Sequence, residues 1–317
     1  MAQSFFAGID VSKARLDVAF SQGDEITESF SIPHTEDQIS GLIEKFKKTL
    51  PQQIVIEASG GLERFLAAYL DEAGLPIAVI NPRQVRDFAR ATGQLAKTDK
   101  IDARTLARFA AVMKPPQRPI KDAQRQQLAD KVARRRQLVH MLAQEKNRRS
   151  RAPGPVRADI EHHIKYLQER LQNSNKDIEQ IIMRTPIYQE TVELLRTVPG
   201  IGPVTTASLI ADCPELGSLN RRQIAALIGT APFNRDSGTR CGTRCVWGGR
   251  RTIRNMLYMA TVSAIKCNYK IRSFHVRLIA AGKKPKVAIT ACMRKLITIL
   301  NAMVKQQRPW DVGPATN

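Results

Sequence analysis

The first third of the chain alternates between two hydrophobic periods. Alternating or continuous apolar runs predict strands at 4–9, 15–20, 26–32, 53–57 and 76–80. Two amphipathic stretches lie among them: one spans 39–46, with Thr35 as a candidate cap and a stop near Pro51, and the other spans 62–73. The pattern therefore predicts an α/β domain.

Two or three antiparallel strands followed by helix, strand, helix and strand is the order of the ribonuclease H-like fold. A further helix is predicted at 101–113, after which the pattern changes. Residues 122–149 are polar and helix-forming with a thin apolar seam, and a second seam runs from 160 to 181 beyond the breaker at 152–155. These two seams predict an antiparallel helical hairpin, or coiled coil.

The remainder of the chain is predicted to be mainly helical. Helices are expected at 204–211, 253–265 and 286–304, and the broad apolar face of the last one indicates core packing. We therefore expect three parts: a ribonuclease H-like domain at 1–115, a helical hairpin at 116–190, and a mainly helical domain at 191–317.

Composition changes the picture through charge. Of 317 residues, 43% are hydrophobic and 25% charged, which excludes a disordered chain or a fibrous repeat. The net charge is +21, far beyond what solubility needs, so a polyanion is the expected partner: nucleic acid first, an anionic membrane surface second. Residues 1–110 hold 13 basic and 15 acidic side chains, 111–190 hold 17 and 9, and 191–317 hold 20 and 5. The positive excess thus lies outside the first third.

Location follows from what the pattern lacks. No apolar run approaches the ~20 residues that cross a bilayer, and the N-terminus does not look like a secretory signal, so we expect a cytoplasmic protein. Five cysteines are consistent with reduced thiols. Cys241 and Cys245 have no second Cys or His pair at zinc-site spacing, which argues against a zinc site.

Four carboxylates are candidate metal ligands. Asp10 and Glu57 are each predicted to lie where an apolar strand runs out, and Asp99 and Asp102 are three apart at the start of a predicted helix. Singly, Asp99 could be a helix cap and Glu57 a surface residue before a turn. Together they supply four hard oxygen ligands, suited to one or two Mg²⁺ ions, with Mn²⁺ as a substitute.

Two later motifs suggest phosphate chemistry. Gly200 and Gly202 lie in VPGIGP at 198–203, which looks like a helix-hairpin-helix element, although an ordinary Pro-Gly turn would have the same letters. Ser237 lies in a loop rich in Gly, Thr and Arg, among several hydroxyls and without an adjacent His to act as base. We expect nucleic-acid contacts from Lys97, Arg104, Arg134, Arg135, Arg136, Arg148, Arg149, Gly200, Gly202, Arg235, Arg240, Arg244, Arg250, Arg251, Lys283, Lys284 and Lys286.

The ordered motifs resemble those of the DEDD insertion-sequence transposases, described as bridge-RNA-guided recombinases. The N-terminal motifs are GIDVSK at 8–13, IEASG at 56–60, VINP at 79–82 and KTDKIDAR at 97–104; the C-terminal ones are Ser237-Gly238, RNMLYM at 254–259 and GKKPK at 282–286. The resemblance implies a resolvase-like first domain with Asp10, Glu57, Asp99 and Asp102 as its catalytic quartet. It also implies Ser237 as the nucleophile that forms a phosphoserine link.

The same resemblance implies a bridge RNA that pairs with donor and target DNA, and dimers that assemble into a tetramer. Two alternatives stay open on the residues alone. One is a resolvase-like two-metal nuclease that uses water, and the other is a structured-nucleic-acid-binding protein without catalysis.

Overall fold

The computed structural model describes residues 4–94, 99–117, 122–234, 242 and 244–311. The chain divides into two compact units, 1–120 and 121–317. Each unit has its own hydrophobic core, built from the apolar positions that the sequence pattern marks.

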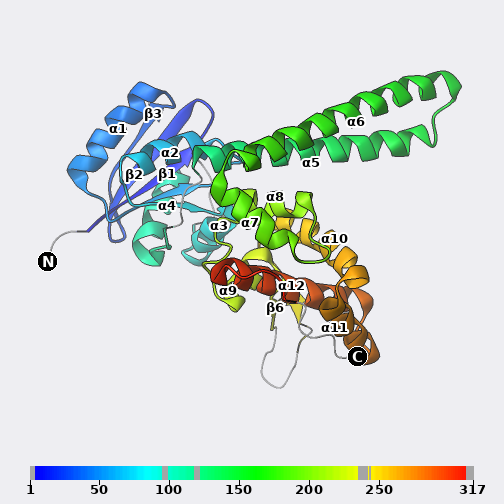
Figure 1. Cartoon of the computed structure of the whole chain (residues 1–317). Coiled ribbons are helices and arrows are strands. Elements are labelled where there is room, and N and C mark those ends of the chain that lie inside the picture. Colours follow the sequence, from blue (N-terminus) through cyan, green and yellow to red (C-terminus); the bar gives the residue numbers. More distant parts are fainter. Residues whose placement is uncertain (1–3, 95–98, 118–121, 235–241, 243, 312–317) are drawn as a thin grey trace. The chain divides into compact units, whose positions relative to one another are not determined.

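The N-terminal unit is built on a five-stranded mixed sheet (Figure 1). Its strands are β1 (Phe5–Val11), β2 (Arg15–Gln22), β3 (Glu25–Pro33), β4 (Gln53–Glu57) and β5 (Ile77–Ile80). The spatial order is β3-β2-β1-β4-β5: the first three strands are antiparallel, whereas β4 and β5 run parallel to β1. This is the predicted ribonuclease H-like arrangement, and the prediction is confirmed.

Helices cover both faces of this sheet because the strand residues alternate in direction. Helices α1 (Glu36–Thr49) and α2 (Glu63–Glu72) bury residues of one face such as Ile9 and Ile56. Helices α3 (Pro82–Ala91) and α4 (Asp99–Met113) cover the other face, where Phe6 and Val55 pack with Leu106. Thr35 is the N-cap residue of α1, as expected, but its side chain makes no capping hydrogen bond.

Helix α3 is absent from the sequence prediction. Its start has a recognisable chemistry, because Asn81 accepts a hydrogen bond from the Arg83 amide at 2.9 Å and Pro82 occupies the first turn. Val85 is the only residue of the helix classed as buried, so its apolar pattern is too thin to predict it.

The second unit begins with the predicted hairpin of α5 (Ala123–Arg149) and α6 (Gly154–Met183) (Figure 1). Asp122 caps α5 by accepting a hydrogen bond from the Arg125 amide at 2.7 Å. Apolar side chains meet along the seam, with Leu138 and Leu142 of α5 against Ile164 and Leu167 of α6. The break between the arms falls at the Pro-Gly segment, as the sequence indicates.

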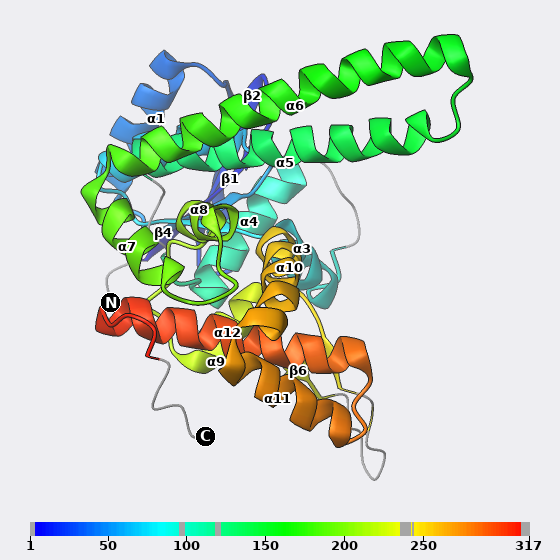
Figure 2. The same ribbon diagram turned by 45° about the vertical axis from the view of Figure 1, so that its right-hand side comes forward.

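Six further helices share one core with contributions from every helix (Figure 2). They are α7 (Pro186–Arg196), α8 (Pro203–Asp212), α9 (Arg221–Ile228), α10 (Arg251–Cys267), α11 (Tyr269–Ala280) and α12 (Pro285–Gln306). A short antiparallel pair, β6 (Pro232–Phe233) and β7 (Cys245–Val246), interrupts the helices and was not predicted.

Helix α12 has the length and hydropathy of a membrane span, with a mean hydropathy of 1.5 over 18 residues. Its apolar face is nevertheless packed inside the unit, since Leu296, Ile297 and Leu300 are fully buried. We therefore interpret α12 as the central helix of the C-terminal core, which is the role the sequence predicted for it.

Candidate functional site

Asp10 and Glu57 lie side by side on neighbouring strands. Strands β1 and β4 are parallel with Ile9 opposite Ile56, so the next positions on the two strands are these carboxylates. The sequence predicted that Asp10 ends its strand, and this is wrong by one residue. Strand β1 runs on to Val11, because β2 continues the ladder and pairs Asp10 with Asp17 and Val11 with Leu16. Glu57 is the last residue of β4, as predicted.

Gly8 brings helix α4 onto this part of the sheet. A Cβ atom at Gly8 would lie 2.2 Å from the Ala107 nitrogen and 2.4 Å from the Ala103 oxygen, so the helix backbone lies directly on β1. Asp10 is two residues further along the strand and faces the same way. Asp102 immediately precedes Ala103. The crossing thus places Asp102 on the face of the sheet that carries Asp10.

Glu57 shares this face, because Val55, two residues earlier, packs against Leu106 of α4. Asp10, Glu57 and Asp102 are all half-buried. Asp99 is the first residue of α4, and its side chain is outside the described part of the structure. Among the described residues no three acidic, His or Cys side chains are close enough to form a metal cluster.

The donor set suits a hard divalent cation. Carboxylates from β1, β4 and α4 supply only oxygen ligands, which Mg²⁺ and Mn²⁺ prefer. The chemistry of these residues therefore fits a divalent metal.

Asp17 is a buried carboxylate that sequence reasoning missed. Its residue is 2% exposed and lies opposite Asp10 in the ladder. It accepts a hydrogen bond from Arg15 Nε at 2.9 Å and another from the Ser31 hydroxyl, so its charge has a local partner. The signal in the sequence is a polar residue amid the apolar strand residues 16–20.

Ser237, with Arg235, Arg240 and Cys241, falls outside the described residues. The chain on either side of this segment is fixed by β6 and β7, where Phe233 pairs with Cys245. Gly229, before β6, and Gly249, after β7, also lie close together. A Cβ atom at Gly249 would lie 2.3 Å from the Gly229 nitrogen, so the two glycines permit a close backbone crossing. Arg254 joins this crossing through a hydrogen bond to the Gly248 oxygen.

Some cations that we expected to bind nucleic acid are used inside the protein. Arg250 makes two hydrogen bonds of 2.6 Å to the Glu215 carboxylate and one of 2.9 Å to the Asp212 carbonyl. Burial by itself would lower the pKa of Arg250, but the ion pair with Glu215 outweighs it and the pKa is raised. This arginine ties the start of α10 to the segment after α8.

The arginine triplet of α5 divides in the same way. Arg136 forms a 2.6 Å ion pair with Asp212, and Arg135 Nε donates to the Asn175 side chain at 2.6 Å. Burial lowers the pKa of Arg135. Arg134 is exposed and donates a 3.0 Å hydrogen bond to the Gln137 side chain of the same helix. Of the three, Arg134 is thus the most accessible to a ligand.

The other expected contacts are exposed wherever the structure describes them. Arg148 is exposed but forms a 2.6 Å pair with Glu145. Lys97 lies outside the described residues. The remaining exposed cations of the expected set are Arg104, Arg149, Arg244, Arg251, Lys283, Lys284 and Lys286.

The two glycines of the VPGIGP motif have different surroundings. Gly200 has φ of 96°, and a Cβ atom there would lie 2.6 Å from the Ala264 Cα of α10, so this glycine is needed for helix packing. Gly202 is the N-cap residue of α8, with open space around it and no side-chain cap. Of the two, only Gly202 leaves room for an approaching phosphate.

Comparison with known sequences places both units of the chain in one group. Residues 7–152 match the model of the IS110-type DEDD transposases, and residues 192–276 match that of the transposase IS116/IS110/IS902 family. The pilin gene-inverting protein of Moraxella lacunata is 28% identical over 96% of this chain and 97% of its own length. An uncharacterized 44.8 kDa protein of insertion element IS116 from Streptomyces clavuligerus is 27% identical over 51% of this chain and 41% of its own length.

Among solved structures, this chain is similar to Thermus thermophilus RuvC in complex with a Holliday junction substrate. The likeness covers 35% of this chain and 96% of the other, with 15% identity and a TM-score of 0.28. The sequence matches are the broader finding, since the two family models together span more than two thirds of the chain. This protein therefore belongs to the IS116/IS110/IS902 family of DEDD transposases.

Proposed function

We propose that this transposase cuts and rejoins the DNA strands of a mobile element through a covalent phosphoserine intermediate, with Mg²⁺ bound by its carboxylates. The observation that supports the metal site best is the Gly8 crossing, which gathers Asp10, Glu57 and Asp102 on one face of the sheet. Family membership supports DNA cleavage and strand transfer as the type of activity.

Asp10, Glu57, Asp99 and Asp102 would hold the metal. Bound there, Mg²⁺ polarises a phosphodiester and offsets charge on the oxygens around the phosphorus. The four carboxylates act by holding the cation at the substrate, whereas Asp17 keeps its own ion pair with Arg15 and stays outside the set. Mn²⁺ is expected to substitute for Mg²⁺ because it accepts the same oxygen ligands.

Ser237 is the proposed nucleophile. Its hydroxyl loses a proton and its Oγ attacks phosphorus, so that an Oγ–P bond forms as the P–O bond to the leaving strand breaks. The cleaved strand leaves as an alkoxide, which takes up a proton and becomes a free hydroxyl. In the rejoining step such a hydroxyl gives up its proton and attacks the phosphorus of a phosphoserine, so that the Oγ–P bond breaks and the serine regains its proton. Arg235 and Arg240 flank the serine in sequence, and their guanidinium groups suit the phosphate oxygens.

We also infer that a bridge RNA selects donor and target DNA by base pairing, with dimers assembling into a tetramer. The support is the family resemblance, together with 20 basic against 5 acidic residues in 191–317. Sequencing the nucleic acid that copurifies with the protein from its own host tests this inference. Recovery of one discrete RNA encoded beside the element is expected, and only unrelated cellular RNA would contradict it.

Covalent trapping tests the serine. Wild-type protein should stay attached to labelled DNA after denaturation, Ser237→Cys should retain weak attachment, and Ser237→Ala should lose it. Thr239→Ala is the matched control, because it removes the nearest competing hydroxyl and should trap DNA normally. Free cleaved ends without attachment would instead indicate a two-metal nuclease that uses water.

Subunit mixing tests whether the site is shared between protomers, as the resemblance implies. An Asp10→Asn subunit mixed with a Ser237→Ala subunit should recover part of the activity that neither has alone, since one composite site keeps both groups. Mixtures that exchange subunits yet remain inactive would contradict the shared arrangement.

A further inference from the structure

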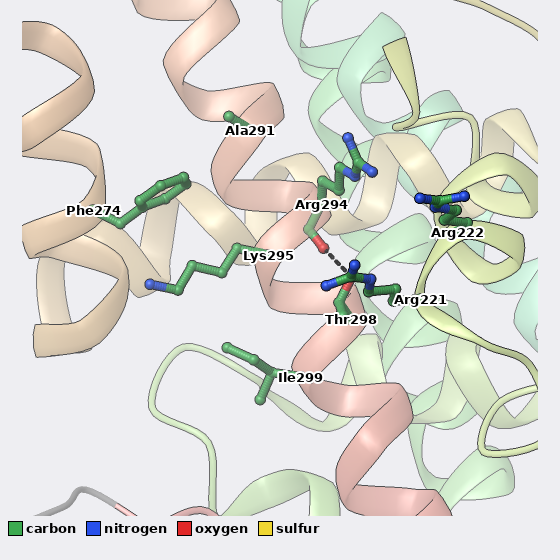
Figure 3. Close-up of a pocket in the computed structure, with 8 residues that line it drawn as sticks. All are labelled: Arg221, Arg222, Phe274, Ala291, Arg294, Lys295, Thr298 and Ile299. Carbon is green, nitrogen blue, oxygen red and sulfur yellow. Dashed lines mark hydrogen bonds between the residues drawn. The ribbon is translucent and has the colours of Figure 1, made fainter. Parts of the chain in front are cut away.

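A basic pocket lies on helices α9, α11 and α12, within the C-terminal unit (Figure 3). It is an open pocket of about 580 Å³. Four cations line it: Arg221 and Arg222 of α9, and Arg294 and Lys295 of α12. The remaining wall is made by Phe274, Ala291, Thr298 and Ile299, so that none of the described lining residues is a carboxylate.

The four cations differ in how far they are buried. Arg221 and Arg222 are exposed, whereas Arg294 and Lys295 are half-buried on α12. Half-burial removes part of the water that solvates a cation, and the cost falls when an anion takes the place of that water. Within the described part of the chain, no ion pair involves any of the four.

This lack of acidic partners distinguishes the four pocket cations from two other arginines of the unit. Arg136 and Arg250 are each paired with a carboxylate at 2.6 Å. Lys295 instead has its ammonium 4.6 Å from the centre of the Phe274 ring, which positions the group without neutralising it. Figure 3 shows Arg221, Arg222 and Arg294 on one side of α12 and Lys295 beside Phe274 on the other.

The backbone at the start of α9 is already satisfied. Asn220 accepts hydrogen bonds from the Arg222 and Gln223 amides at 2.9 and 3.0 Å, and the Gln223 side chain completes a capping box. Thr298 likewise donates its hydroxyl to the Arg294 carbonyl at 2.8 Å. Charged side chains, rather than the helix terminus, are therefore what the pocket offers to a ligand.

We propose that this pocket binds the sugar-phosphate backbone of a nucleic acid. Its volume far exceeds the ~30 Å³ share of one water molecule, so a run of backbone fits better than a single small ion. Guanidinium forks suit phosphate oxygens, and such contacts fix position without reading bases. The inference needs neither the serine nor the metal ligands, and DNA and RNA backbones offer the same chemistry.

The test measures how affinity depends on salt. Arg221→Gln with Arg222→Gln should lower the slope of log affinity against log salt by up to about 2, since each lost phosphate contact removes about 0.9. Adding Arg294→Gln and Lys295→Gln should lower it by up to about 4. At 100 mM salt we expect at least about 10-fold weaker binding for the fourfold variant.

Lys266→Gln with Lys305→Gln is the matched control. Both lysines are exposed on the same unit, outside the pocket, and their removal lowers the net charge by the same amount as the first pair. The control should keep the wild-type slope. Thermal melting checks that each variant is folded, and the exposed α9 pair decides the matter if the fourfold variant unfolds.

Two probes separate the sources of the backbone: a 30-base-pair DNA duplex of mixed sequence and an RNA stem-loop. A reduced slope with only one of them assigns the pocket to that nucleic acid, and a reduction with both assigns it to either backbone. Wild-type slopes for both probes in the α9 pair overturn the proposal, as would equal losses in the control pair. An acidic protein as the true ligand would produce the first of these results.

Discussion

The two units of this transposase use charge in opposite ways. In the N-terminal unit, carboxylates from three elements lie on one face of the sheet in a nearly neutral domain. In the C-terminal unit, arginines and lysines greatly outnumber acids, and many of those that the structure describes are exposed on helix surfaces. The first arrangement suits a cation at the reacting phosphate, and the second suits a long polyanion. Substitutions in the first unit should therefore change the rate of DNA cleavage, and substitutions in the second unit should change the affinity for nucleic acid.

The sharpest separation should come from Asp10→Asn. We expect strand cleavage to fall at least about 100-fold, because an amide is a poorer ligand than a carboxylate for a divalent cation, while DNA affinity stays unchanged. Unfolding should change little, since one source of carboxylate repulsion is removed. Cleavage rate and affinity, measured in parallel, check the two halves of the prediction.

Asp71→Asn is the control for that experiment, since Asp71 is exposed on α2 and belongs to none of the motifs. It should cleave normally. EDTA should abolish cleavage by the wild type, Mn²⁺ should restore it, and Ca²⁺ should not. Undiminished cleavage in EDTA would refute the metal proposal.

Gly8→Ala should damage the N-terminal unit without touching a metal ligand. The added methyl group meets the backbone of α4, so we expect a loss of about 3 kcal/mol or more in the free energy of unfolding of this unit. Gly41→Ala, on the open surface of α1, should instead stabilise by about 0.5–1 kcal/mol. Denaturant titration with a probe in each unit measures both, and equal effects of the two variants would exclude the tight crossing.

Arg250→Met should weaken the C-terminal unit instead. The variant removes the ion pair of Arg250 with the Glu215 carboxylate, whose side chain is 11% exposed. The loss costs about 2–3 kcal/mol, given that Arg250 is itself 29% exposed. Arg251→Gln, at the exposed neighbouring position, should change unfolding by less than about 0.5 kcal/mol. Loss of nucleic-acid affinity in Arg250→Met without loss of stability would show that Arg250 binds phosphate after all.

The smallest effect concerns alkaline pH. Burial raises the pKa of Cys213 to about 12 and that of Cys292 to about 11, and the N-terminal 120 residues contain no cysteine. Unfolded thiols ionise first, so the stability that neutral thiols give is complete below about pH 8.5 and falls as pH rises from there toward 11. Cys213→Ser and Cys292→Ser should flatten this slope in the C-terminal unit alone, as urea unfolding at pH 8 and 10 would show.

Much of the N-terminal fold is predictable because its signals are local. Strands 53–57 and 76–80 and the intervening helix have strong periods, and their order defines the sheet. The same locality explains the errors. Helix α3 has too few apolar residues to produce a period, and β6 and β7 are only two residues each.

Long-range contacts were not predictable from one sequence. The residues next to Gly8 in the sequence give no sign that α4, about a hundred residues later, packs on this glycine. Arg250 looks like any phosphate-binding arginine until its carboxylate partner, 35 positions away, is known. Asp10 was placed at a strand end because the pairing with β2 that extends the strand is itself a tertiary feature.

The length of the hairpin of α5 and α6 determines how far its tip extends from the rest of the second unit. Its arms of 27 and 30 residues correspond to roughly 40 and 45 Å of helix. Seam residues of α6 recur at heptad spacing, from Ile160 and Ile164 through Leu167 and Leu171 to Ser174 and Ile178. Removing seven residues from both arms would keep the seam in phase and retract the tip by about 10 Å. Five residues are not a whole number of helical turns, so removing five would rotate the apolar seam of an arm away from the seam of the other arm. The hairpin can therefore change its length during evolution only by numbers of residues that keep the two apolar seams facing each other, such as whole heptads.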